Sequence, residues 1–158
     1  MMGQDAIAII PASTVKVRNR DVEFDYRQDS DFMYLTGFHE PESVAVLVPG
    51  REQAQFILFC RERDMKMETW NGRRAGQKGA VDIHGADDAF PIGDINEILP
   101  GILEQRERVF YTMGVNAEFD HHVIGWVNHF RENGRGGSHT PLEVIALEHL
   151  LQDLRVFK

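Results

Sequence analysis

The chain has 158 residues, 42% of them hydrophobic, which is enough for one ordinary domain with its own core. Its 17 basic and 25 acidic residues give a formal net charge of -8, which repels phosphate backbones and anionic lipids and argues against nucleic acid or a membrane as a partner. The single cysteine, Cys60, excludes an internal disulfide, and the longest apolar run is too short to cross a bilayer, so we expect a cytoplasmic protein.

Short apolar runs in the first third of the chain predict strands. Residues 5–11 form a continuous β-branched run ended by Pro11, which is typical of a strand covered on both faces at the centre of a sheet. Three further strand candidates follow at residues 32–36, 43–48 and 55–60. Pro49-Gly50 is a strong turn signal, so the last two candidates should form a hairpin.

Two polar segments lie around these runs. Residues 18–30 are charged and follow neither a strand nor a helix period, so we interpret them as a loop or a short turn of helix. Residues 61–85 are rich in charge and glycine, yet they contain Trp70, an unusual residue for a linker. Because loops often carry function, both segments are candidate sites.

Helices are predicted in the second half of the chain. Residues 94–105 have apolar positions at helical spacing, with Asp94 placed for an N-cap and Pro100 expected to bend or divide the helix. Residues 118–132 form a second helix that ends at the stop signal Asn133-Gly134.

The remaining elements are a strand and a last helix. Residues 109–113 are predicted to form the strand. The helix should run from Pro141 to Leu154, with Thr140 as N-cap and Glu143 completing a capping box. Strands early and helices late predict an α/β fold in which helices flank a mixed sheet on both faces.

Local patterns do not favour a metal or nucleophile site. His122 and His129 lie seven residues apart, two helical turns, and cannot reach one ion as ligands at i and i+4 would. A structural role beside a buried stripe is therefore the favoured interpretation of the histidines, the stripe being Phe119, Val123, Trp126 and Phe130. Cys60 ends a very apolar strand and is interpreted as a core residue.

The paired acids are interpreted in the same way. Asp29 with Asp31, and Asp87 with Asp88, are sequence neighbours that do not by themselves make a two-metal site, so we expect solvated turn acids. The serines lack a G-x-S-x-G elbow, and no phosphate-binding glycine loop follows a strand.

What remains is a group of charged and aromatic residues in the two polar segments: Arg18, Arg20, Asp21, Tyr26, Arg27, Trp70, Arg73 and Arg74. An exposed tryptophan in a polar loop is a candidate for contact with a ligand or a partner subunit. The alternative is a tryptophan folded back on its own domain, and the local pattern does not separate the two.

Three strings, taken in order, resemble the N-terminal domain of the Xaa-Pro aminopeptidases, also called aminopeptidase P. They are YRQDSDFMYLTGFHEPE at 26–42, ETWNGRRAG at 68–76 and LRVFK at 154–158. The first string is long and specific, the second follows at the expected distance, and the similarity spans nearly the whole chain.

The resemblance implies a fold of the creatinase N-terminal-domain type, which is ribonuclease-H-like, over residues 1–158. It implies that the parent protein is a cytoplasmic metallo-aminopeptidase that removes the N-terminal residue preceding proline. Two manganese ions would lie in a C-terminal pita-bread catalytic domain that this chain is expected to lack, so the chain alone should hold no metal and no catalytic residue. Its expected partners are that catalytic domain, other subunits of a homo-oligomer, and the peptide substrate.

By matching positions, the resemblance also implies site residues. Asp21 would approach the free α-amino group of the substrate, and Trp70 would line the cleft. Tyr26, Arg27, Arg73 and Arg74 would support the loops or an interface.

Two other functions remain open on the sequence. A stand-alone interaction module could have the same fold without catalysis, and a prolidase or creatinase relative would share the architecture but act on dipeptides or creatine. The strings at 26–28 and 70–74 favour the aminopeptidase.

Overall fold

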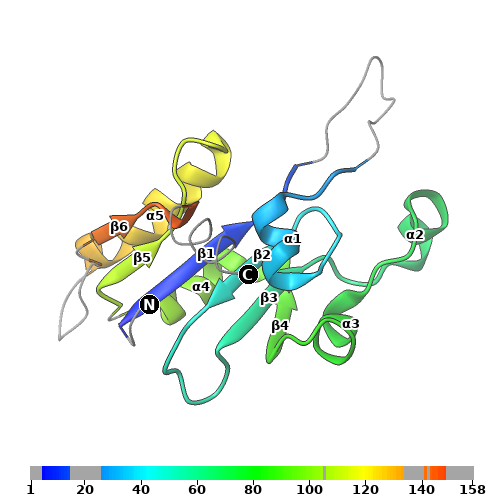
Figure 1. Cartoon of the computed structure of the whole chain (residues 1–158), viewed down its shortest axis with the longest axis horizontal. Helices are drawn as coiled ribbons and strands as arrows, with labels where there is room; N and C mark the ends of the chain where they lie inside the picture. The colour runs from blue at the N-terminus through cyan, green and yellow to red at the C-terminus, as the bar shows by residue number, and fades with distance from the viewer. Residues whose placement is uncertain (1–4, 15–25, 105, 134–140, 142, 149–158) are drawn as a thin grey trace. The chain divides into compact units, whose positions relative to one another are not determined.

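The computed structural model describes residues 5–14, 26–104, 106–133, 141 and 143–148. Its elements are, in chain order, β1 (Ala6–Pro11), α1 (Ser30–Thr36), β2 (Val44–Leu47), β3 (Phe56–Cys60), α2 (Met65–Asn71), α3 (Gly76–Asp82), β4 (Asp88–Pro91), the 3-10 turn η1 (Ile92–Asp94), α4 (Ile95–Leu103), β5 (Arg108–Phe110), α5 (Ala117–Asn133) and β6 (Glu143–Ile145). The described strands form a mixed six-stranded sheet in the order β4-β3-β2-β1-β5-β6 (Figure 1). The predicted α/β class with a mixed sheet is therefore confirmed.

The chain divides into two compact units, which are described separately. The first unit comprises Met1–Ile9, Val46–Gln55 and Asp94–Lys158, and the second comprises Ile10–Ala45 and Phe56–Gly93. Within the described residues, no helix combines the length and apolarity that a membrane crossing requires.

Strand β1, which belongs to the first unit as far as Ile9, is buried and has a strand on either side. All five residues from Ala6 to Ile10 are buried, as the continuous apolar run predicts. β1 pairs in parallel with β5, where Ile7 lies opposite Val109. Its place between β2 and β5 confirms the prediction of a central strand.

The predicted last helix is wrong at its start, because residues there form strand β6. β6 pairs in parallel with β5, and the Tyr111 N–H donates to the Ile145 carbonyl at 2.9 Å. Glu143, expected in a capping box, instead donates its N–H to the Glu107 carbonyl at 3.1 Å. The open edge of β5 offers this segment backbone partners, and local helix signals do not report such a partner. Residues 147 and 148 are helical, as expected, whereas Thr140 and the expected continuation over residues 149–154 lie outside the described residues.

The helices α4 and α5 are joined by a buried tryptophan. Trp126 of α5 is buried, and its Nε1 donates to Asn96 Oδ1 of α4 at 2.8 Å. Val123 is also buried, so the predicted apolar stripe of α5 is confirmed at these two positions. α4 runs through Pro100 without being divided, and Asp94 occupies the N-cap position without a side-chain hydrogen bond.

In the second unit, the predicted strand at residues 32–36 is wrong, because this segment is helix α1. The Asp29 carboxylate caps the helix by accepting the Phe32 N–H at 2.9 Å, and Gly37 ends it with φ +66°. Phe32 and Thr36, four residues apart, are the buried members of α1. The two buried positions lie on one helical face, while Met33 and Tyr34 are exposed, and a run this short does not distinguish a helix from a strand.

The rest of the second unit contains the first two residues of β2, then β3 and the segment that follows β3. β2 and β3 are sheet neighbours, in agreement with the predicted pair. Cys60 at the end of β3 is fully buried, and burial raises the pKa of its thiol to about 11, so its interpretation as a core residue is confirmed. The segment 61–85 contains the helices α2 and α3, and β4, which the sequence analysis did not predict, pairs in parallel with β3.

Two of the paired acids, Asp29 and Asp87, accept hydrogen bonds from backbone N–H groups. Asp29 caps α1, and Asp87 Oδ2 accepts the N–H of Phe56 at 2.9 Å, at the start of β3. Asp29 therefore supports a local turn, as expected, whereas Asp87 bonds to a residue 31 positions away in the sequence.

Tyr111 provides a testable anchor for α5 in the first unit. It is 2% exposed, its hydroxyl donates to Asp120 Oδ1 of α5, and Asp120 Oδ2 accepts the N–H of Gly114 at 2.9 Å. Burial, together with the neighbouring carboxylate, raises the pKa of Tyr111 above its usual range. The tyrosine therefore stays neutral and remains a hydrogen-bond donor.

We predict that Tyr111→Phe lowers the free energy of unfolding by about 1.5 kcal/mol, because a hydrogen bond to a charged acceptor is lost from a buried position. Urea denaturation followed by circular dichroism measures the change. Val115→Ala, at a position 79% exposed in the adjoining loop, is the control and should stay within about 0.5 kcal/mol of the parent. Equal stabilities for Tyr111→Phe and the parent would contradict this role.

Candidate functional site

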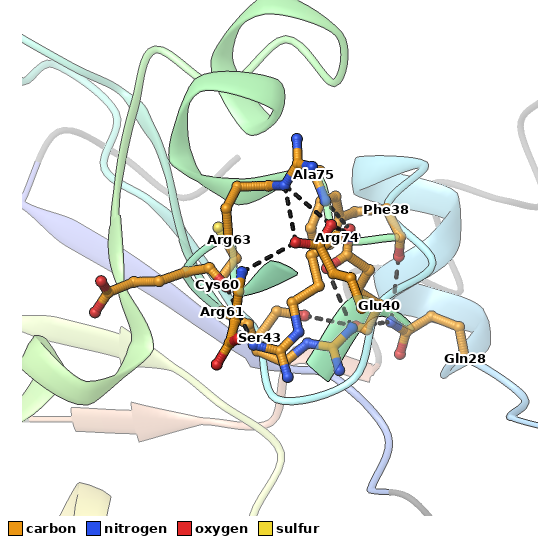
Figure 2. Close-up of polar contacts among 12 residues, drawn as sticks. Gln28, Phe38, Glu40, Ser43, Cys60, Arg61, Arg63, Arg74 and Ala75 are labelled. Carbon is orange, nitrogen blue, oxygen red and sulfur yellow. Dashed lines mark hydrogen bonds and ion pairs between the residues drawn. The ribbon is translucent and has the colours of Figure 1, made fainter. Parts of the chain in front are cut away.

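Polar contacts in the second unit gather around Glu40, as Figure 2 shows. Glu40 Oε1 accepts from Arg61 Nη2 at 3.3 Å, and Oε2 accepts the backbone N–H of Ala75 at 2.8 Å. Glu40 lies between α1 and β2, Arg61 follows β3, and Ala75 precedes α3. One carboxylate therefore joins three segments that are distant in the sequence.

A second carboxylate, that of Glu68, holds the loop next to Ala75. Its Oε1 accepts the backbone N–H of Arg74 at 2.7 Å and lies 3.0 Å from Arg63 Nε, while its Oε2 accepts the N–H of Asp64 at 3.0 Å. The Arg74 N–H, assisted by the donors of Arg63 and Asp64, holds the pKa of Glu68 below its usual range. The carboxylate is therefore ionised at neutral pH.

Helix α2, which carries Trp70, is exposed along its length. Asp64 caps its start by accepting the N–H groups of Lys66 and Met67. No apolar side chain from residue 65 to residue 70 is buried, and Met65 and Trp70 are each 82% exposed, whereas the Glu68 side chain is only 8% exposed. Trp70 therefore does not fold back on the part of the chain that the structure describes, and α2 presents an apolar surface to its surroundings.

Two glycines give the loop after α2 its shape. Gly72 has φ +93° and caps α2, and Gly76 has φ +69° at the start of α3. A Cβ added to Gly76 would lie 2.6 Å from Cγ of Arg63, the residue that pairs with Glu68. The glycines of the WNGRRAG string are thus required by backbone conformation at both positions and by close packing at the second.

Gln28 holds the backbone of residues 38–40 through hydrogen bonds. It is 7% exposed, and its Nε2 donates to the carbonyl groups of Phe38 and Glu40 at 3.2 and 3.0 Å. Its Oε1 accepts from the backbone N–H of Ser13, the hydroxyl of Tyr26 and the backbone N–H of Asp29. This buried amide therefore has both its donor and its acceptor groups satisfied.

Tyr26 extends the same network. Its hydroxyl also lies 2.9 Å from the Ser13 carbonyl, and its ring packs edge-on against His39 at 5.5 Å between centroids. Burial raises the pKa of Tyr26 to about 12, so the residue is neutral at physiological pH. Its contacts support the chain around Gln28.

Arg27 lies beside a shallow pocket along α1, which Gln28, Ser30, Met33 and Tyr34 also line. Met33 and Tyr34 are 40% and 38% exposed, so this face of α1 combines apolar surface with a cation.

The structure places the predicted site residues as follows. Trp70 and Arg74 lie on the segment that Glu68 holds, and Arg74 Nη1 also donates to the Glu62 carbonyl at 3.1 Å. Arg73 is exposed in the same loop. Tyr26 is linked to Glu40 through Gln28, whereas Asp21, Arg18 and Arg20 lie outside the described residues.

The sequence analysis did not single out Glu40, Glu68 and Gln28. Each stands inside one of the strings that carry the resemblance, at the end of GFHE, at the start of ETW and in YRQ. Their membership of these strings was the one indication that they matter. The sequence does not predict that a polar side chain in a charged segment binds a distant backbone group.

Metal ligands do not gather in the described part of the chain. No group of three or more histidine, cysteine, aspartate or glutamate side chains among these residues could hold a metal ion. His121, His122 and His129 are exposed on α5.

The arrangement is that of a rigid support for exposed groups, and comparison with known proteins identifies its kind. The family description "Aminopeptidase P, N-terminal domain" matches residues 1–111. The chain belongs to this family. The recognition made from the three strings is thus confirmed.

Similar proteins agree with this assignment. The Xaa-Pro aminopeptidase of Escherichia coli is 35% identical over 99% of this chain. The structure of the Pseudomonas aeruginosa aminopeptidase PepP matches with a TM-score of 0.94 and 56% identity over 98% of this chain. A zinc-substituted E. coli aminopeptidase P in complex with product matches with a TM-score of 0.92 and 35% identity over 99% of this chain. The chain spans 36%, 35% and 36% of these proteins respectively, so it corresponds to about a third of each.

We predict that Gly76→Ala lowers the free energy of unfolding by about 2 kcal/mol or more, because an unfavourable φ adds to the clash with Arg63. Gly72→Ala should cost about 1 kcal/mol, since its Cβ would meet nothing within 4 Å and only φ is unfavourable. Urea denaturation measures both changes.

Gly101→Ala, in α4 with no heavy atom within 4 Å of the added Cβ, is the matched control and should be neutral or stabilising. A Gly76→Ala chain as stable as the Gly101→Ala chain would show that the contact with Arg63 is not restrictive.

Proposed function

We propose that this chain is the non-catalytic N-terminal domain of a metal-dependent Xaa-Pro aminopeptidase, a protein that removes an N-terminal residue preceding proline. The proposal is supported by membership of the aminopeptidase P N-terminal domain family. In it, the chain forms a wall of the substrate cleft and contributes contacts between subunits of a homo-oligomer. Catalysis, with two manganese ions, belongs to a C-terminal domain of the parent protein, which is this chain's principal partner.

The observation that carries a substrate-binding role is the exposure of Trp70 on a helix held by two carboxylates. Keeping a large apolar ring in water is unfavourable unless a ligand or partner covers it. A peptide with proline at its second position offers an apolar ring that packs well on an indole face. We therefore propose Trp70 as a substrate-binding residue, with Tyr26, Arg27, Arg73 and Arg74 supporting the loops or an interface.

Asp21 is the second proposed substrate-binding residue. Its carboxylate would bind the positively charged α-amino group of the peptide, an ion pair that strengthens in a partly desolvated cleft. The proposed location of the parent protein is the cytoplasm, which is consistent with a buried cysteine that has no disulfide partner.

The division of labour between domains is tested by comparing this chain with a longer protein that carries it at its N-terminus. Given an Xaa-Pro tripeptide and manganese, the longer protein should release the first residue, while the chain alone should release none. Liquid chromatography of the released amino acid measures both. Turnover by the chain alone that is lost in Asp21→Asn would overturn the proposal, and a longer protein that cleaves dipeptides but not tripeptides would indicate a prolidase instead.

The role of Trp70 is tested by Trp70→Ala in the longer protein. We expect kcat/KM for peptides longer than a dipeptide to fall about tenfold, equivalent to about 1.4 kcal/mol, through the loss of contact area in the cleft. Trp70→Phe should retain most of the activity because it keeps an aromatic face. Ile83→Ala, at another exposed apolar position (77%) of the same unit, is the control and should leave kcat/KM unchanged. An unaltered kinetic profile in Trp70→Ala would remove Trp70 from the cleft.

A further inference from the structure

We propose that Glu40 and Glu68 are positioning residues, which hold helix α2 and so fix Trp70 in the orientation that the substrate meets. This inference rests on the proposed role of Trp70 as a substrate-binding residue. It assigns a function to two acids whose carboxylates face backbone N–H groups of the chain itself.

The first step of the argument is that α2 lacks the usual means of staying in place. The helix has seven residues, shorter than the roughly 12 residues at which an isolated helix becomes even marginally stable. None of its apolar side chains from residue 65 to residue 70 is buried, so no apolar face fixes it to a core, whereas the Glu68 side chain is only 8% exposed. Its position must therefore come from polar contacts at its ends.

Glu68 supplies contacts at both ends of the helix. Its Oε2 accepts the N–H of Asp64, the N-cap residue, at 3.0 Å. Its Oε1 accepts the N–H of Arg74, beyond the C-cap Gly72, at 2.7 Å. A carboxylate that accepts backbone N–H groups makes hydrogen bonds about twice as strong as neutral ones. The Glu68 side chain thus connects the start of α2 to the loop that follows the helix.

Glu40 then fixes that loop to the rest of its unit. The N–H of Ala75, next to that of Arg74, donates to Glu40 Oε2 at 2.8 Å (Figure 2). Arg61, at the end of β3, donates to the other carboxylate oxygen, and Gln28 holds the Glu40 carbonyl from below. Glu40 and Arg61 retain only 17% and 15% of their side-chain exposure, so water competes weakly for these bonds.

The two carboxylates therefore act in series. Glu68 connects α2 to residue 74, and Glu40 connects residue 75 to β3 and to the segment before β2. Removing either link should leave the sheet intact and allow Trp70 to move. Such movement should weaken substrate binding. A mobile Trp70 loses contact area with the peptide and must be ordered again when the peptide binds.

A double-mutant cycle in the longer protein tests this coupling. Glu68→Ala should lower kcat/KM for a long Xaa-Pro peptide about tenfold in the parent background, and less than twofold when Trp70 is already alanine. Glu68→Gln, which keeps one acceptor oxygen, should recover part of the loss. Glu97→Ala, at an exposed glutamate of α4, is the control and should have no effect in either background. Equal effects of Glu68→Ala with and without Trp70 would overturn the proposal.

Hydrogen exchange on the same proteins tests the anchoring without catalysis. By mass spectrometry, the peptide spanning residues 65–76 should exchange at least tenfold faster in Glu68→Ala and in Glu40→Ala, while the peptide spanning 106–113 keeps the parent rate. Unchanged exchange at 65–76 would overturn the anchoring. Faster exchange there combined with normal kinetics in Trp70→Ala would leave the anchoring in place and refute the substrate role of Trp70. Faster exchange in both peptides would report global unfolding, and Glu68→Gln then replaces Glu68→Ala in both measurements.

Discussion

The second unit depends on carboxylates that accept backbone N–H groups from neighbouring residues of one loop. Arg74 donates to Glu68 and Ala75 donates to Glu40, at 2.7 and 2.8 Å. Such bonds specify where a loop lies more sharply than apolar contacts do, because they fix direction as well as distance. With these bonds, polar contacts hold the segment that carries a tryptophan 82% exposed, and none of its apolar side chains is buried in the core.

The buried amide of Gln28 extends this principle to the other side of Glu40. Gln28 binds carbonyl groups at 38 and 40 and accepts donors from residues 13, 26 and 29, so segments from three parts of the chain converge on one side chain. A buried amide with every group satisfied stabilises one arrangement, whereas a partly satisfied one is costly. The strings YRQ and GFHE are thus parts of one hydrogen-bond network.

Acids and glycines of the matched strings shape the loop that follows α2. Glu40 and Glu68 accept hydrogen bonds from backbone N–H groups of this loop and pair with arginines. Glycines at 72 and 76 adopt φ values that other residues rarely take, and Arg63 packs where a Cβ would be. The residues of the WNGRRAG string therefore mainly determine the shape of the loop, and Trp70 is the exposed apolar residue among them.

The sequence by itself determined the elements with strong local patterns: the buried run of β1, the helices α4 and α5, the core role of Cys60, and, through three strings, the family. Only the tertiary structure decided the elements whose partners are distant. Residues 32–36 form a helix because Asp29 and Gly37 cap it, and residues 143–145 form a strand because the edge of β5 accepts them. Glu40 and Glu68 likewise became visible only through their bonds to residues 75 and 74. A local pattern encodes periodicity and capping, whereas the acceptor of a backbone N–H that lies 35 residues away is fixed only when the chain has folded.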